Sequence, residues 1–151
     1  MDLLLWRHAD AEDPPPGGAD AERRLTQKGL KQAARVAAWL DARLPAAARV
    51  IVSPAARAQQ TAAALSRSSA TSDRLSPGAK PAEVLEAAGW PAAGDETVII
   101  VGHQPTLGAA AALALTGKAA AWRLKKGAVW WLRSEDGGPA LVVAVITPDL
   151  V

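Results

Sequence analysis

Short apolar runs bounded by polar residues recur along this chain. Residues 3–6, 50–52 and 97–101 are unbroken runs of apolar or β-branched residues. Runs of three to five such residues, with turn-forming residues around them, are typical of strands that are buried on both faces. Two more apolar runs, at 127–133 and 141–146, are joined by a segment containing an Asp-Gly pair. That pair predicts a hairpin between two closing strands.

Between the first two runs, the apolar residues are spaced for a helix. The predicted helix lies between Thr26, a good N-terminal cap, and Pro45, whose ring prevents the helix from continuing. Lysine, glutamine and arginine occupy its other side, so the helix is amphipathic. Its apolar face is expected to consist of residues three and four positions apart, namely Leu30, Ala33, Ala37, Leu40 and Leu44.

Three further helices are predicted. Ser53-Pro54 is a favourable helix start, because Ser can cap and Pro at the first helical position loses no hydrogen bond. This second helix is expected to run to about Arg67. Shorter helices are expected at 81–88 and from Pro105 to Thr116, each stopped by a glycine, Gly89 or Gly117.

The order of these elements predicts the fold class. Strands alternate with helices, which indicates an α/β protein with three layers, α/β/α, a mostly parallel central sheet and a short antiparallel tail. Residues 12–24, rich in Pro, Gly and charge, and residues 66–79, rich in Ser, are predicted to be loops. No break in composition divides the chain, so residues 1–151 are expected to form a single domain that buries about 70% of its unfolded surface.

Composition then excludes several classes of protein. There is no cysteine, so disulfides, thiolate metal sites and cysteine nucleophiles are ruled out. The 17 Lys and Arg are interleaved with 15 Asp and Glu, whereas a nucleic-acid reader gathers its cations on one face. No apolar stretch reaches the roughly 20 residues of a membrane span, and the acidic start does not fit a secretory signal. We therefore expect a cytoplasmic protein with no nucleic-acid partner and no membrane contact.

Two arginines and two histidines follow three of the predicted strands. Arg7-His8 ends the first run, Arg57 lies in the helix that follows 50–52, and His103 follows 97–101. Ligands bind beyond the carboxyl ends of parallel strands, so these side chains are expected to meet there. Arginine suits phosphoryl oxygens, and a neutral imidazole can attack phosphorus. The pattern predicts a phosphate site with His8 as nucleophile and Arg7, Arg57 and His103 around the oxygens. It holds no metal, since the two histidines lack a third ligand at a useful spacing.

The segments that carry these residues resemble the histidine phosphatase superfamily. They are Leu4-Leu5-Trp6-Arg7-His8-Ala9, Leu25-Thr26-Gln27-Lys28-Gly29, Ser53-Pro54-Ala55-Ala56-Arg57-Ala58-Gln59-Gln60-Thr61-Ala62 and Val101-Gly102-His103-Gln104-Pro105. The small size and the Arg-His-Ala-Asp-Ala opening are most similar to the SixA-type phosphohistidine phosphatases, over residues 1 to about 116. The resemblance implies a phosphoglycerate mutase-like α/β/α fold and a transient phosphohistidine on His8. It also implies a phosphate pocket of Arg7, Arg57 and His103, without metal or other cofactor.

Two departures from the family pattern bear on the substrate. The family usually has Gly after the first histidine, where this chain has Ala9. Many relatives also use a carboxylic acid to protonate the leaving group, and no motif identifies one here among the conceivable residues Asp10, Glu12, Asp73, Glu83 and Glu86. An alkoxide gains about 10²–10⁴-fold from such an acid, whereas imidazole leaves with less help. The missing acid, and a chain too short for lid insertions, favour phosphohistidine on a protein as the substrate.

Two alternatives stay open at this point. One is a phosphatase for small phosphorylated metabolites, such as a sugar phosphate or a nucleotide. The other is a phosphate-binding signalling module that has lost turnover. The sequence predicts neither the oligomeric state nor whether the loop at 12–24 folds over the pocket.

Overall fold

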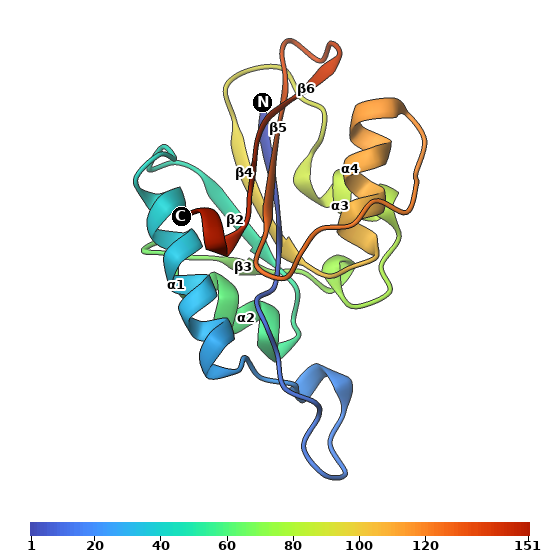
Figure 1. The fold of residues 1–151 in the computed structure, drawn as a ribbon. Helices are drawn as coiled ribbons and strands as arrows, with labels where there is room; N and C mark the ends of the chain where they lie inside the picture. The colour runs from blue at the N-terminus through green and yellow to red at the C-terminus, as the bar shows by residue number, and fades with distance from the viewer.

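The computed structural model describes residues 1–151 and is built on one six-stranded sheet (Figure 1). The order across the sheet is β3-β2-β4-β1-β5-β6, with β3, β2, β4 and β1 parallel and β5 and β6 antiparallel. This confirms the predicted α/β class with a mostly parallel sheet. The strands are β1 (Asp2–Arg7), β2 (Arg49–Val52), β3 (Ala70–Thr71), β4 (Thr97–Gly102), β5 (Val129–Ser134) and β6 (Ala140–Ile146).

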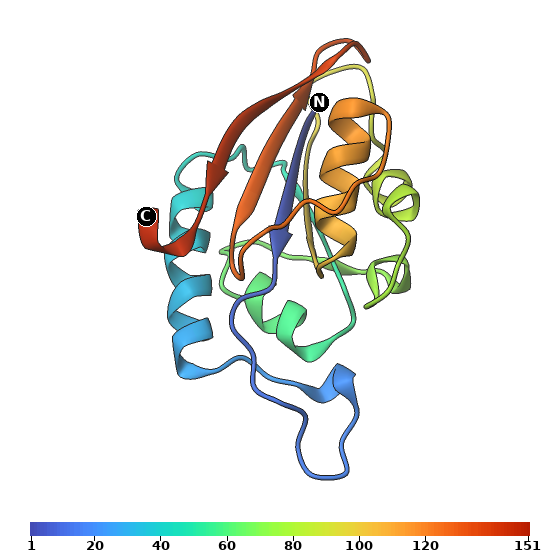
Figure 2. The ribbon, with the colours of Figure 1, turned by 45° about the vertical axis from the view of Figure 1, so that its right-hand side comes forward.

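Four helices cover the two faces of this sheet. Helices α1 (Gln27–Asp41) and α2 (Ala56–Ala62) lie on one face, and α3 (Pro81–Ala88) and α4 (Thr106–Thr116) lie on the other (Figures 1 and 2). Short 3-10 turns occur at Asp20–Glu22, Asp73–Leu75 and Pro148–Leu150. No helix is both long and apolar enough to cross a membrane.

The alternation of side chains along β1 explains why the core has two halves. Leu3 and Leu5 pack among the residues of α3 and α4, whereas Leu4 and Trp6 pack among those of α1 and α2. Successive residues of a strand point to opposite faces, so a strand covered on both sides must be apolar throughout. This is why the first run contains no polar residue before Arg7, where the strand leaves the core.

Helix α1 follows the prediction at its start and departs from it at its end. The Thr26 hydroxyl accepts a hydrogen bond from the backbone N–H of Gly29, so Thr26 is the cap that was expected. The helix ends at Asp41, because the last residues before Pro45 tighten into a turn in which Arg43 N–H donates to Leu40. Leu30 was expected on the apolar face, but it is 40% exposed.

The predicted second helix is wrong at both ends. It was expected from Ser53-Pro54 to about Arg67, and α2 spans only Ala56–Ala62. At the start, the Ser53 hydroxyl accepts from Ala55 N–H rather than capping the helix. Beyond its end, Asp41 accepts hydrogen bonds from the backbone of Ser66 and the guanidinium of Arg67, which holds the chain in an irregular path. Residues 70–71, predicted to be loop, pair with β2 as the short edge strand β3.

The remaining elements lie close to their expected positions. Gly89 and Gly117 end α3 and α4 with positive φ values, as the sequence indicated. The closing strands form the predicted hairpin, whose turn holds Asp136 and Gly137 at φ of 52° and 72°. Gly108 of α4 approaches the Trp122 carbonyl so closely that a Cβ at this position would overlap it. That approach fixes the segment before β5 against α4.

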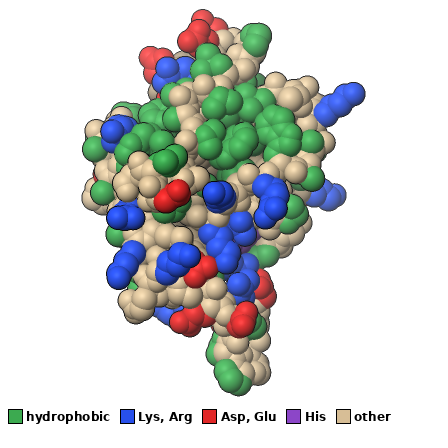
Figure 3. All heavy atoms as spheres, viewed as in Figure 1, with side chains coloured by type: hydrophobic (Ala, Val, Ile, Leu, Met, Phe, Trp, Pro, Cys, Tyr) green, Lys and Arg blue, Asp and Glu red, His purple; other side chains and the backbone are tan.

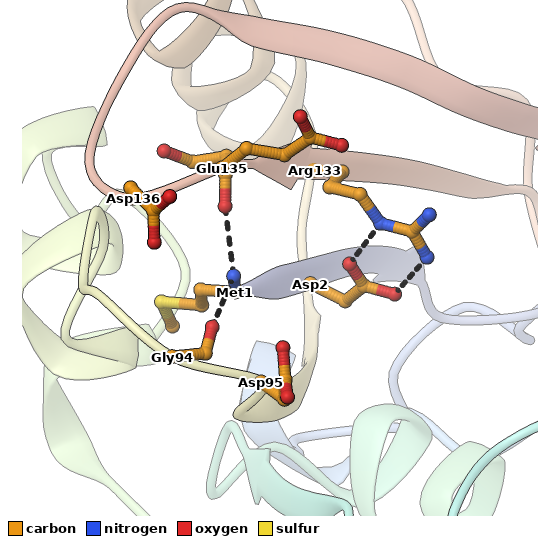
Figure 4. Close-up of a pocket in the computed structure, with 8 residues that line it drawn as sticks. Met1, Asp2, Gly94, Asp95, Arg133, Glu135 and Asp136 are labelled. Carbon is orange, nitrogen blue, oxygen red and sulfur yellow. Dashed lines mark hydrogen bonds and ion pairs between the residues drawn. The ribbon is translucent and has the colours of Figure 1, made fainter.

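The amino ends of the strands form the edge of the sheet away from the expected site. A cavity of about 410 Å³ lies there, lined mainly by polar and acidic residues (Figure 4). The Met1 ammonium donates to the carbonyls of Gly94 and Ser134, and Asp2 accepts two hydrogen bonds from Arg133. Each of these contacts joins the start of β1 to a neighbouring segment. We therefore assign a structural role to the residues that line this cavity.

Candidate active site

The strand register brings three chain segments to one edge of the sheet. Arg7 pairs with Gly102, and Val52 pairs with Val101, so β1, β2 and β4 end at the same level. The next residue along each strand is His8, Ser53 or His103, and all three are buried. Backbone hydrogen bonds from His8 to Gly102 and from Ser53 to Val101, each 3.0 Å, hold the ends together.

The tautomer of His8 is set by the main chain. Its Nδ1 lies 2.8 Å from the Ala9 carbonyl oxygen. Because a carbonyl only accepts, the ring proton must be on Nδ1, and Nε2 carries the lone pair. Ala9 itself is fully buried in a small apolar cluster with Leu25 and Ala33, so its methyl group packs without disturbing this contact.

Arg57 is the charged group that contacts His8. Its Nε–H donates to His8 Nε2 at 3.3 Å, at the long end for a hydrogen bond. Arg57 lies in the first turn of α2, as predicted, and only 4% of it is exposed. Thr61 fixes this arrangement: its hydroxyl donates to the Arg57 carbonyl and accepts from Ala9 N–H, at 2.8 and 3.1 Å. Helix α2 is thereby tied to the residue that orients His8.

His103 lies beside His8, with ring centroids 5.2 Å apart. Its Nε2 is 2.7 Å from the Ser53 hydroxyl, and its buried Nδ1 has no partner. Ser53 was predicted to be a cap, but its hydroxyl lies between a backbone N–H and this imidazole. If this hydroxyl donates to Nε2 while it accepts from Ala55, the ring proton of His103 is on Nδ1.

Arg7 completes the group of four. Its Nη1 donates to the Leu124 carbonyl at 2.8 Å, and its buried Nε has no partner. Burial, and then the nearby charge of Arg123, lower the pKa of its guanidinium. The structure therefore brings together Arg7, His8, Arg57 and His103, which lie far apart in the sequence.

Both histidines are held in the neutral form. Burial lowers the pKa of His8 to about 4, against a smaller opposite effect of the Ala9 hydrogen bond, and the charges of Arg57 and Arg7 add to the decrease. Burial also lowers the pKa of His103 to about 3, with further contributions from Arg57 and His8. A neutral His8 has a free lone pair at physiological pH, which a nucleophile requires. A bound anion would offset the positive charge around the two histidines.

One carboxylate, that of Asp20, contacts Arg57 of the four residues, and sequence reasoning missed it. Its Oδ2 accepts from Arg57 Nη2 at 3.0 Å and its backbone carbonyl from Nη1 at 2.9 Å. The loop at 12–24 therefore does reach the candidate site. Burial opposes ionisation of Asp20, but the hydrogen bond and charge of Arg57 outweigh it and lower the pKa. Nothing local marks Asp20, because its partner lies 37 residues further along the chain.

Three of the carboxylates considered from the sequence are engaged elsewhere. Asp10 forms an ion pair with Lys126 at 2.8 Å and accepts from the Thr26 hydroxyl. Glu83 accepts from the backbone N–H of Lys80 at the start of α3, and Glu86 pairs with Arg74. Glu12 and Asp73 are exposed, and their carboxylates form no hydrogen bond or ion pair with the four residues. No group of three His, Asp or Glu side chains is placed to hold a metal ion.

Two imidazoles and two guanidinium groups at the carboxyl edge of a parallel sheet define this protein as an α/β protein with a candidate phosphate site. Comparison with known families agrees with that class. Residues 3–80 match the histidine phosphatase superfamily (branch 1), and the chain belongs to this family.

The chain is also similar to individual relatives and solved structures. It is 37% identical to the uncharacterized protein Rv1276c of Mycobacterium tuberculosis over 107 residues, which is 70% of this chain and 66% of the relative. Among solved structures it is similar to a candidate phosphohistidine phosphatase SixA from Nakamurella multipartitia, with a TM-score of 0.82, 28% identity and coverage of 97% and 95% of the two chains. It also shares the fold of the protein histidine phosphatase SixA bound to tungstate, with a TM-score of 0.78, 21% identity and 99% of each chain covered.

Proposed function

We propose that this protein is a phosphatase that hydrolyses phosphohistidine on other proteins, with His8 as the nucleophile. The observation that carries the proposal is the unprotonated Nε2 of His8, held 3.3 Å from the Arg57 guanidinium and beside the His103 ring. The similarity to a candidate phosphohistidine phosphatase supports this choice of substrate.

The reaction takes two displacements. His8 Nε2 attacks the phosphorus of the substrate, a bond forms between this nitrogen and phosphorus, and the bond to the substrate imidazole breaks. Water then attacks the phosphorus on His8, releasing inorganic phosphate and regenerating the neutral ring as the proton of water leaves to solvent. Dividing one difficult displacement in this way is the usual advantage of covalent catalysis.

The surrounding residues stabilise charge on the transferring group. Phosphoryl transfer depends mainly on alignment and on neutralising the equatorial oxygens. Arg57 supplies a buried guanidinium group and Arg7 a half-buried one, and the Nε of Arg7 and the Nδ1 of His103 have no hydrogen-bond partner within the protein. With the ring proton of His103 on Nδ1, all three side chains donate hydrogen bonds to the phosphoryl group.

The absence of a well-placed neutral acid favours a good leaving group. Asp20 is the carboxylate nearest the chemistry, and Arg57 keeps its pKa low, so it is ionised near pH 7 and carries no proton to donate. A phosphohistidine whose other ring nitrogen is protonated releases neutral imidazole without a proton donor. An alkoxide from a sugar phosphate would need one.

The experiment is to trap the intermediate. After brief exposure to phosphoramidate with labelled phosphorus and quenching in alkali, we expect label on His8 that is stable to alkali and lost in acid. His8→Ala should carry none, and Lys118→Ala, a change far from the site, should label like the wild type. Label that persists in His8→Ala would contradict the role of His8.

A substrate panel tests the rest of the proposal. Turnover of a phosphohistidine peptide should exceed turnover of sugar phosphates and nucleotides by at least the 10²-fold that a missing acid costs. Faster turnover of the metabolites would favour the small-molecule alternative. Binding of tungstate without hydrolysis of any phosphodonor would favour a phosphate-binding module.

A further inference from the structure

A second charged surface begins where the phosphate site ends. A cleft of about 1140 Å³ runs from Arg7 along α1 and contains seven Lys and Arg but only two carboxylates, Asp10 and Asp149. Figure 3 shows many Lys and Arg side chains in a band across the middle of this face, with fewer acidic side chains among them. Positive and negative residues are interleaved along the sequence. The fold gathers more of the positive ones on this surface, so the charge here is not evenly mixed.

The cations come from two segments that face each other across the cleft. Lys28, Lys31 and Arg35 lie three and four residues apart, on one face of α1. Arg123, Lys125 and Lys126 lie in the segment before β5. Of all the cations in the cleft, only Lys126 is within ion-pair distance of a carboxylate, that of Asp10. The other six cations form no ion pair, and Asp149 is the only other carboxylate that lines the cleft.

From this juxtaposition, and resting on the proposed function, we propose that the cleft is the docking surface for an acidic segment of the phosphorylated protein. Arg7 belongs both to the cleft and to the group around His8, so an occupant would present its phosphoryl group at His8 and its carboxylates along α1. The opposite edge of the sheet carries Asp95, Glu135 and Asp136 (Figure 4). An acidic partner would be repelled there and attracted to the cleft.

The shape and lining of the cleft favour an acidic protein segment over other anions. Its volume exceeds the roughly 300–1,000 Å³ of most small-ligand pockets. Binding of single-stranded nucleic acid relies on aromatic side chains that stack on bases, and no aromatic residue lines the cleft. Reading a duplex requires an element that enters a groove, whereas this surface is itself concave.

The test compares two peptides that carry phosphohistidine, one flanked by Asp and Glu and one by Lys and Arg, with phosphoimidazole as the small substrate. For the intact chain at low ionic strength, we expect kcat/KM on the acidic peptide to exceed that on the basic peptide about tenfold or more. The preference should weaken as salt is raised, because the charges are exposed.

The variant K28E/K31E should lower the ratio of kcat/KM on the acidic peptide to that on phosphoimidazole about tenfold. Glutamate is a good helix former and is favourable near a helix N-terminus, so α1 should remain folded. The matched control is R43E/K118E, which makes the same charge change beyond the carboxyl ends of α1 and α4, and it should keep the wild-type ratio. Equal rates on the two peptides, or a preference that K28E/K31E leaves unchanged, would overturn the proposal.

A binding measurement separates this proposal from the proposed function. The same peptides are labelled with fluorescein and carry a stable phosphonate analogue of phosphohistidine, and their affinity is measured by anisotropy. If the acidic peptide binds more tightly through Lys28 and Lys31 while no phosphodonor is hydrolysed, the docking surface stands and the activity fails. If single-stranded RNA or duplex DNA displaces the acidic peptide with higher affinity, the surface is a nucleic-acid site and the proposal is overturned.

Discussion

Replacing Asp20 by alanine should strengthen the binding of a phosphate-like anion. In the structure, Arg57 donates to His8 through Nε, to the Asp20 carbonyl through Nη1 and to the Asp20 carboxylate through Nη2. An oxyanion that binds Arg57 competes with this carboxylate for the positive charge of the guanidinium. The Asp20→Ala variant removes this competitor and keeps the backbone carbonyl.

The size of the effect follows from the exposure of the two partners. The Asp20 side chain is 58% exposed and that of Arg57 only 4%. Exposed ion pairs contribute about 0.2–1 kcal/mol, and the buried guanidinium places this pair near the upper end. A gain of about 1 kcal/mol corresponds to roughly fivefold tighter binding.

The assay is isothermal titration of the protein with tungstate near neutral pH. The matched control is Asp13→Ala, which removes an exposed carboxylate from the same loop that forms no ion pair. We expect a roughly fivefold lower Kd for Asp20→Ala and little change for Asp13→Ala. An unchanged or weaker affinity in Asp20→Ala would refute the idea that the loop competes with the ligand.

Two further predictions concern stability. His8 and His103 are harder to protonate when folded than when unfolded, so the unfolded state binds more protons between about pH 4 and 6.5 and the free energy of unfolding should fall as pH falls through that window. The loss should reach up to about 2 kcal/mol per histidine between pH 7 and 5 by urea unfolding, and a variant with His8→Ala and His103→Ala should lose less; equal slopes would contradict the low pKa values. Gly108→Ala should lower Tm by several degrees, because the added Cβ overlaps the Trp122 carbonyl and overpacking costs about 1–3 kcal/mol; an unchanged melting curve would show that α4 and this segment can move apart.

Most of the fold could be predicted because its signals are local. Buried parallel strands require unbroken apolar runs. A glycine after a helical segment indicates its end, as Gly89 and Gly117 do for α3 and α4. The errors fall where distant residues decide the local structure. Helix α2 ends early because Asp41, 25 residues before Ser66, accepts a hydrogen bond from the backbone N–H of Ser66 and holds the chain in an irregular path. The strand β3 consists of two exposed residues held by backbone pairing with β2, so it leaves no apolar pattern.

The site shows the same division. Arg7, His8, Arg57 and His103 could be named because each follows a recognisable strand and strand ends converge. Asp20, Thr61 and the Leu124 carbonyl could not, because each acts through a contact with a residue 37 or more positions away or through the backbone. Ser53 was recognised as a hydroxyl at a helix start, but its bond to His103 required the register of β2 and β4.

The hydrogen bond from His8 Nδ1 to the Ala9 carbonyl has a consequence for how this protein can diverge. Since the orienting acceptor belongs to the peptide backbone, no single side-chain deletion removes it. Position 9 can therefore vary among small residues in related sequences while the ring of His8 keeps its orientation. Selection at position 9 would then limit the size of the side chain that packs against Leu25 and Ala33, without changing the hydrogen bond to His8.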